Sequence, residues 1–82
     1  MPRIIDGNQS NIIGKNVKKA RVLRKMSQKQ LAEKLETLAV YICRGSISRI
    51  ESGERTVTDI EIEGLAKVLG VPIEYLFNQK DN

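Results

Sequence analysis

Apolar residues recur along the chain at helical spacing, in stretches separated by caps and turn residues. In the first stretch, Ile13, Val17 and Ala20 share one face, at spacings of four and three, and lysines occupy the other face. The pattern predicts a helix that begins at residues 10–12 and ends near Lys25. Its basic last turn lies at the negative end of the helix dipole.

Two capping boxes predict the starts of two further helices. Ser27 with Gln30, and Thr58 with Glu61, each place a hydroxyl three residues before an amide or carboxylate side chain. Each pair can satisfy backbone N–H groups that a helix start leaves free. The helix after Ser27 buries Leu31 and Leu35, and the helix after Thr58 has its own apolar stripe at Ile62, Leu65, Ala66 and Leu69.

A third helix is predicted between these two, from about Arg44 to Ser52. Ile47 and Ile50 form its apolar face. Cys43 stands at the N-cap position, where a thiol is a poor substitute for Ser or Thr, and the loss of a good cap typically costs about 1 kcal/mol. We therefore expect a looser start for this helix.

The remaining segments complete an all-α fold of five helices. Gly70 ends the fourth helix, and Pro72 suits the first position of a short fifth helix that ends near Phe77. Residues 1–10 are polar and rich in turn formers, which predicts a flexible arm, and residues 79–82 predict a frayed end. Residues 11–78 then form one domain, because 82 residues are too few for two cores.

Charge is distributed unevenly along the chain. The net charge is +4, and the stretch 15–30 contains seven basic residues and no acid. Such a run is as compatible with a solvated helix face as with a polyanion, but its position beside the Ser27 cap favours phosphate contact. Aromatic residues make up only 4% of the chain, which argues against a single-strand binder that stacks bases on rings.

Composition also excludes several kinds of chemistry. Histidine is absent and Cys43 is the single cysteine, so neither an internal disulfide nor a Cys/His metal site is available. No glycine motif for nucleotides is present, and we expect neither catalysis nor a cofactor. No segment is apolar enough for a membrane span or a signal peptide, which suggests a protein of the reducing cytoplasm.

The stretch Ser27 to Arg55 resembles a known family. Its Ser-Gln-x-Gln-Leu-Ala start and the run Ser-Ile-Ser-Arg-Ile-Glu-Ser-Gly-Glu-Arg at 46–55 are similar to the Cro/repressor-type (XRE family) helix-turn-helix regulators of bacteria and phages. The resemblance extends from about Ile13 to Phe77. It implies a five-helix, lambda-repressor-like DNA-binding domain whose third helix enters the major groove.

The link between the second and third helices departs from the family pattern. Ala32 and Ile47 are 15 positions apart (47 minus 32), where the tight-turn form of the motif needs about ten. The extra residues, 36–42, are largely apolar. We expect an extended second helix followed by a longer hydrophobic connection that Val22 and Leu23 cover.

The outer face of the third helix is the candidate for base contacts, because arginine can bond guanine O6 and N7 together. By resemblance, Arg44, Gly45 and Arg49 fall on base-reading positions, and Gly45 allows close approach of the backbone. The alternative is that both arginines are solvated or touch phosphate. The base-reading candidates are Arg44, Gly45, Ser46, Ser48 and Arg49.

Phosphate contacts are expected around this helix and at the start of the second helix, where free N–H groups attract anions. Gln28 matches a backbone-binding glutamine of the family. The candidates are Ser27, Gln28, Lys29, Arg55, Thr56, Lys15 and Lys18.

By resemblance, Arg21 and Glu51 form an ion pair that bridges the first and third helices. The alternative is two unconnected surface charges. We assign the pair to structure and not to DNA contact, because each residue lies on an otherwise apolar face.

Together these observations predict a non-enzymatic regulator that binds specific double-stranded DNA as a homodimer, most often to repress transcription. Two other functions fit the same residues. One is the antitoxin of a toxin–antitoxin pair, with a toxin as protein partner. The other is a protein-interaction module that no longer reads DNA, as Cys43 and Gly45 stand where stronger DNA contacts are usual.

Overall fold

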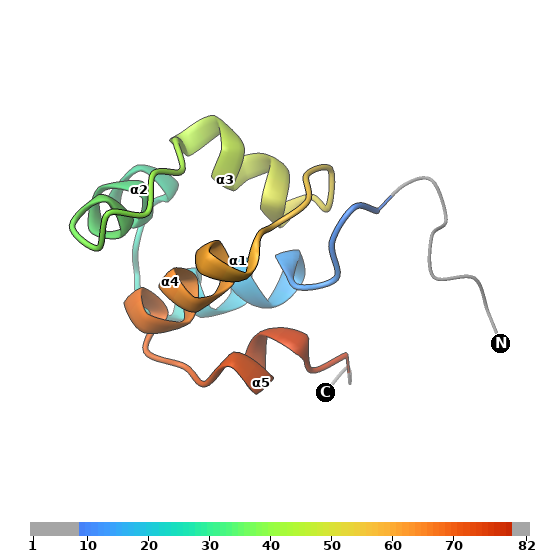
Figure 1. Cartoon of the computed structure of the whole chain (residues 1–82). Helices are drawn as coiled ribbons and strands as arrows, with labels where there is room; N and C mark the ends of the chain where they lie inside the picture. Colours follow the sequence, from blue (N-terminus) through green and yellow to red (C-terminus); the bar gives the residue numbers. More distant parts are fainter. Residues whose placement is uncertain (1–8, 80–82) are drawn as a thin grey trace, which may run out of the picture.

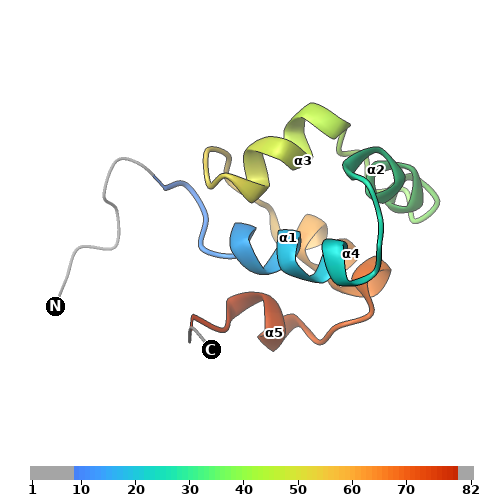
Figure 2. The same cartoon turned by 180° about the vertical axis from the view of Figure 1, so that it is seen from behind.

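The structure, a computed structural model, describes residues 9–79. This range contains the helices α1 (Gly14–Leu23), α2 (Gln28–Glu36), α3 (Arg44–Glu51), α4 (Asp59–Leu69) and α5 (Ile73–Phe77). The all-α fold class with five helices is thereby confirmed. α3 and α5 lie on opposite sides of the bundle, with α1 and α4 between them (Figures 1 and 2). The predicted arm and the predicted frayed end fall mostly on residues 1–8 and 80–82, outside the described residues.

Every helix contributes to one hydrophobic core. Val17, Leu31, Ile47, Leu65 and Leu76, one from each helix in chain order, are fully buried. The apolar stripes predicted from helical periodicity are therefore the surfaces that pack together. Because α3 packs through Ile47, the opposite face of that helix stays at the surface.

α1, α2, α3 and α4 end in the same backbone motif. The residue that closes each has a positive φ: 58° at Lys25, 61° at Ala39, 82° at Gly53 and 71° at Gly70. After Ala39, the Val40 N–H donates to the Leu35 carbonyl at 3.0 Å, and the Ala39 N–H donates to Glu36 at 2.9 Å. This is the Schellman arrangement, for which glycine is the favoured residue. Lys25 and Ala39 adopt it with a Cβ present, at a cost of about 1 kcal/mol each.

The link between α2 and α3 differs from the expected extension of the second helix. α2 ends at Glu36, and the left-handed Ala39 turns the chain away from the helix axis. The following Val40 and Ile42 are buried. The expectation of an extended helix is wrong because the Schellman motif satisfies the last carbonyls of α2 within the link itself.

The cover of the link also differs from expectation. Val22 and Leu23 are 55% and 72% exposed, so they do not form part of the core over the link. Instead, Val40 packs on α4, where its Cγ2 lies 2.9 Å from the place that a Cβ on Gly64 would occupy. The small residue at Gly64 lets the link approach α4 closely.

α1 is shorter than predicted at both ends, since it begins at Gly14 and ends at Leu23. At its start, the Asn11 Oδ1 accepts hydrogen bonds from the N–H groups of Ile13 and Gly14, at 3.1 and 2.8 Å. The same side chain donates through Nδ2 to the carbonyls of Ile50 and Arg55, at 3.1 and 2.7 Å. Asn11 therefore fixes the start of α1 against the end of α3. In α5, Pro72 is the N-cap and not the first helical residue.

Candidate nucleic-acid interface

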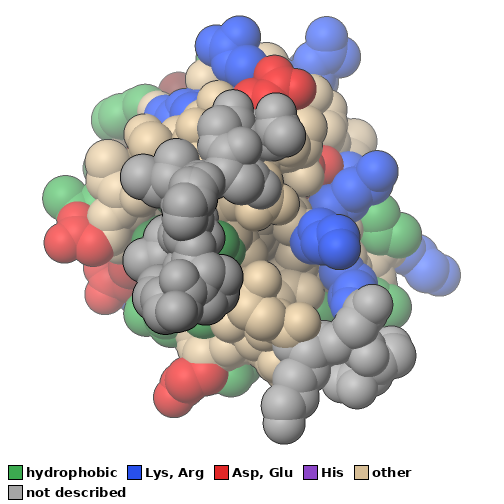
Figure 3. Space-filling view, turned by 90° about the vertical axis from the view of Figure 1, so that its right-hand side faces the viewer, with side chains coloured by type: hydrophobic (Ala, Val, Ile, Leu, Met, Phe, Trp, Pro, Cys, Tyr) green, Lys and Arg blue, Asp and Glu red, His purple; other side chains and the backbone are tan. Residues whose placement is uncertain are grey.

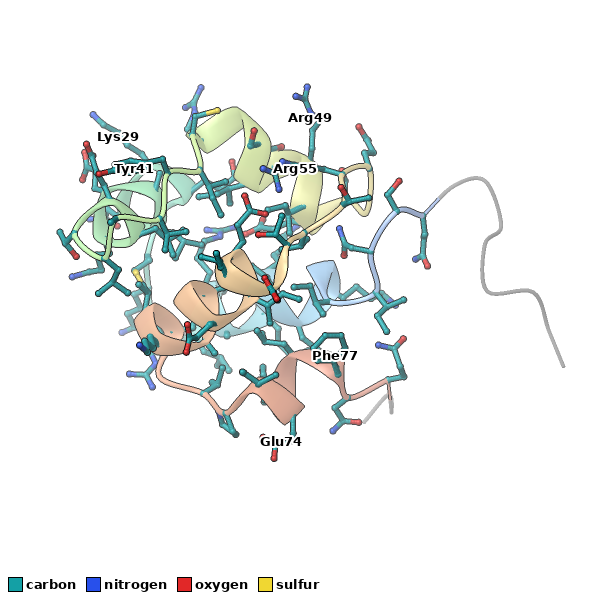
Figure 4. The ribbon with its side chains drawn as sticks, in the orientation of Figure 1. Lys29, Tyr41, Arg49, Arg55, Glu74 and Phe77 are labelled. Atoms are coloured by element: carbon teal, nitrogen blue, oxygen red, sulfur yellow. The ribbon has the colours of Figure 1, made fainter. Side chains whose placement is uncertain are left out.

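The outer face of α3 is open to solvent along its length. Ile47 and Ile50 point into the core. Arg49 points outward, away from the rest of the bundle (Figure 4). Of the residues predicted to contact bases, Ser46 is half-buried, and the others are exposed: Arg44, Gly45, Ser48 and Arg49.

Arginines differ sharply in what their guanidinium groups contact. Arg21 bonds Glu51, Arg55 bonds Glu61, and Arg24 donates to the Gly70 carbonyl at 3.2 Å. Within residues 9–79, by contrast, the guanidinium groups of Arg44 and Arg49 have neither an ion pair nor a hydrogen bond. These two groups, both on α3, remain available to a partner molecule.

The start of α3 lacks the side-chain cap that closes the starts of α2 and α4. Cys43 has the extended backbone of an N-cap, but its side chain makes no cap hydrogen bond. The thiol instead donates to the Ser46 hydroxyl, with 3.5 Å between Sγ and Oγ. Hydrogen bonds that the thiolate accepts, first from the Ser46 hydroxyl and then from backbone N–H groups at the helix start, lower the pKa of the exposed Cys43 below its ordinary value. An uncapped helix start of this kind attracts anions.

Arg21 and Glu51 form a two-point ion pair between α1 and α3. Arg21 Nε lies 2.6 Å from Oε2 and Nη2 lies 3.0 Å from Oε1 of the carboxylate. The side chains are only 11% and 4% exposed. The Gln28 amide, from the first position of α2, also donates to Oε1 at 3.0 Å. Glu51 therefore joins three helices.

Gln28 and Arg55, both predicted to contact phosphate, hold protein groups in this structure. Arg55 bonds Glu61 through two nitrogens, each 3.0 Å from a carboxylate oxygen, and it also donates to the Thr56 carbonyl. The hydrogen bonds from Arg55 lower the pKa of Glu61, and those to Glu61 raise the pKa of Arg55. Sequence reasoning treated Glu61 as a cap alone, although an acid six residues after Arg55 was a signal for this pair.

The other predicted phosphate contacts are at the surface. The Ser27 hydroxyl accepts from the Gln30 N–H at 3.0 Å, which completes the predicted cap. Lys29 and Arg49 both lie on the upper side of the molecule, Lys29 on α2 and Arg49 on α3 (Figure 4). Seen from the side, basic side chains gather along the upper and right edges, with acidic side chains between them at the top and further acidic ones at the left and lower edges (Figure 3). Contact with phosphate stays a prediction for four exposed residues: Lys15, Lys18, Lys29 and Thr56.

Other kinds of site find little support in the described part of the chain. It contains no group of three His, Cys, Asp or Glu side chains placed to hold a metal ion. Among residues 9–79, no helix has the length and apolar character that a membrane crossing requires.

Comparison with known proteins agrees with this geometry. A model of the helix-turn-helix family matches residues 17–76. Comparison with curated protein sequences found no match. Among solved structures, the restriction-modification controller protein C.AhdI from Aeromonas hydrophila shares 26% identity at a TM-score of 0.70, over 79% of this chain and 87% of that chain.

A second solved structure supports the fold alone. The DNA-binding domain of BldD is 20% identical at a TM-score of 0.70, over 90% of this chain and all of that chain. The family match covers most of the chain, from α1 through α5. The chain therefore belongs to the helix-turn-helix family of DNA-binding transcriptional regulators, of the Cro/repressor (XRE) type.

Proposed function

We propose that this protein is a sequence-specific repressor that reads the major groove of double-stranded DNA with α3. One observation carries the proposal: Arg44 and Arg49 lie on the exposed face of α3, and their guanidinium groups have no partner within residues 9–79. A guanidinium in this position can bond O6 and N7 of guanine together. The uncapped start of α3 adds N–H groups that suit a phosphate of the same strand.

The proposed active form is a homodimer. Two copies related by a two-fold axis would place their α3 helices in successive major grooves, about 34 Å apart. An apolar patch supports self-association: Ile12 and Phe77 are exposed, and with Val57 and Ile62 they line a shallow hollow of about 340 Å³ near the turn that follows α3. Phe77, the last residue of α5, is 41% exposed, and its ring lies on the side of α5 that faces α1 (Figure 4).

The proposed mechanism of repression is occlusion. A dimer seated on its site excludes other proteins from the same DNA, and this needs neither catalysis nor a cofactor. The similarity to C.AhdI, which is named a controller protein, supports a regulatory role. The largely buried Arg21–Glu51 pair would keep α3 rigid, so little order has to be gained on binding.

Selection of bound fragments from a random duplex library tests the proposal. We expect enrichment of a palindrome with half-site centres about 10 base pairs apart. Affinity should fall steeply with salt, by about 0.9 in the logarithmic slope for each phosphate contact. Light scattering of the complex should show two copies on each site. If no sequence is enriched, the proposal that the protein reads a specific sequence is contradicted. If light scattering shows one monomer on each footprint, the proposed homodimer is contradicted.

A further inference from the structure

Tyr41, in the link between α2 and α3, is 74% exposed, more than any other large hydrophobic side chain that the structure describes. Between Ala39 and α3 the side chains alternate: Val40 and Ile42 are buried, and Tyr41 and Cys43 are exposed. The two buried neighbours anchor the backbone on either side of Tyr41. Its outward direction is therefore built into the fold and is not the property of a loose loop.

Tyr41 lies at the edge of an open hollow of about 550 Å³ between α2, the link and the first turn of α3. Lys29 of α2 and Arg44 of α3 line the same hollow. Tyr41 therefore shares the hollow with two cations that are predicted to contact DNA. Lys29 and Tyr41 are close together at one end of the molecule (Figure 4). Glu33 and Glu36 line the part of the hollow nearer the end of α2.

The charges fix which edge of the hollow an anion can use. Lys29 is in the first turn of α2, and Glu33 and Glu36 follow it by about 6 and 10 Å along the helix axis. A phosphate is attracted to the Lys29 and Arg44 edge and repelled from the part of the hollow that Glu33 and Glu36 line. Tyrosine suits that edge, since its hydroxyl is a common donor to phosphate and its ring packs against the sugar.

We propose that Tyr41 contacts the sugar-phosphate strand beside the start of α3 and thereby sets where α3 sits along the groove. This inference rests on the proposed function, because it assumes that α3 enters the major groove. It gives the lengthened link a role: residues 36–42, which exceed the ordinary tight turn, carry the contact to DNA. Two buried anchors hold the contact in place before DNA arrives.

The test uses the full chain and the duplex selected for the wild type. Tyr41→Ala should weaken binding about tenfold and Tyr41→Phe about threefold, in line with one hydrogen bond and one ring contact. The salt slope should stay that of the wild type, because tyrosine carries no charge. Leu23→Ala is the matched control, since Leu23 is 72% exposed and lies outside the hollow. In ethylation interference, one phosphate at the edge of each half-site should block binding of the wild type when it is ethylated, but should no longer affect binding of Tyr41→Ala.

The outcomes separate the two proposals. If the wild type binds with a steep salt slope and both Tyr41 variants bind equally well with unchanged interference, the contact is refuted and the proposed function stands. If the wild type selects no duplex at all, the proposed function fails first, and this inference fails with it. Because Tyr41 is exposed, the variants should melt at the wild-type temperature, which circular dichroism can verify.

Discussion

The Arg21 guanidinium and the Glu51 carboxylate tie α1 to the last residue of α3 through two hydrogen bonds, 2.6 and 3.0 Å long. A third group, the Gln28 amide, holds the same carboxylate from α2. The helix proposed to read DNA is thus fixed at its end by charge and along its inner face by Ile47 and Ile50. This leaves only its outer face to a ligand.

Arg21→Ala should destabilise the fold strongly. The substitution leaves the Glu51 carboxylate buried without its cation, and the loss of one partner of such a pair costs about 3 to 5 kcal/mol. Lys18→Ala, on the exposed face of the same helix, should change stability by less than about 0.5 kcal/mol. Denaturant unfolding measures both. Equal effects would show that the pair contributes little to stability.

Gly14 and Gly45 should respond to alanine in opposite directions. A Cβ on Gly14 would lie 2.1 Å from the Ile50 carbonyl oxygen, so the backbones of α1 and α3 must move apart, at a cost of about 1 to 3 kcal/mol. At Gly45 no atom lies within 4 Å of the added Cβ, and alanine should stabilise α3 by about 0.5 to 1 kcal/mol.

Thermal melts compare the two glycine variants directly. A Gly14→Ala protein as stable as the wild type would mean that α1 and α3 are farther apart than in this structure. For Gly45→Ala, duplex binding gives a second measurement, since close approach of the backbone to DNA predicts weaker binding in spite of the more stable helix.

Ala39→Gly should stabilise the protein by about 1 kcal/mol. The left-handed φ of 61° strains alanine, and glycine adopts it freely. Ala32→Gly, inside α2, is the matched control and should destabilise by about 1 kcal/mol for the opposite reason. If Ala39→Gly also destabilises the protein, then the link does not end α2 in the Schellman arrangement.

Local patterns predicted the elements of this fold well. The capping boxes at Ser27 and Thr58 form as expected, because each depends on residues three apart in one segment. The end of α2 was missed because Ala39 carries no glycine signal for a left-handed turn. Without that signal, the apolar link resembled a continuing helix.

The candidate site was predictable only in part. The exposure of Arg49 follows from its place between Ile47 and Ile50 on α3. The bonds of Asn11 to the carbonyls of Ile50 and Arg55 have no local signature, since they join residues 39 and 44 positions apart. Such contacts depend on how α1 packs on α3, which periodicity does not specify.

Glu61→Gln should flatten the acid dependence of stability. Hydrogen bonds from Arg55 lower the pKa of Glu61 in the folded state, so its charged form contributes stability at pH values above the ordinary glutamate pKa of about 4.3. That stability is lost as pH falls from about 4.3 through the lowered value. The variant should be less stable at pH 7 and lose less stability between neutral and acidic pH.

Glu74→Gln, at an exposed position of α5 that points away from the bundle (Figure 4), is the control for the loss of one carboxylate. Melts of the three proteins at several pH values measure the effect. If Glu61→Gln and the wild type lose equal stability on acidification, the bond to Arg55 does not contribute to the folded state.

Arg49→Ala should relax base discrimination at one position of the selected site by about 1 to 3 kcal/mol, because the guanidinium projects from the outer face of α3. Lys29→Ala, at the start of α2, should instead weaken binding to all duplexes alike. It should also reduce the logarithmic salt slope by about 0.9, the value for one phosphate contact. Fragment selection repeated on each variant separates base contact from phosphate contact. Arg44→Ala shows whether the lengthened link shifts base contact toward the start of α3. If the sequence selected by Arg49→Ala is unchanged, α3 docks in another orientation, and the exposed guanidinium of Arg49 contacts only phosphate or solvent.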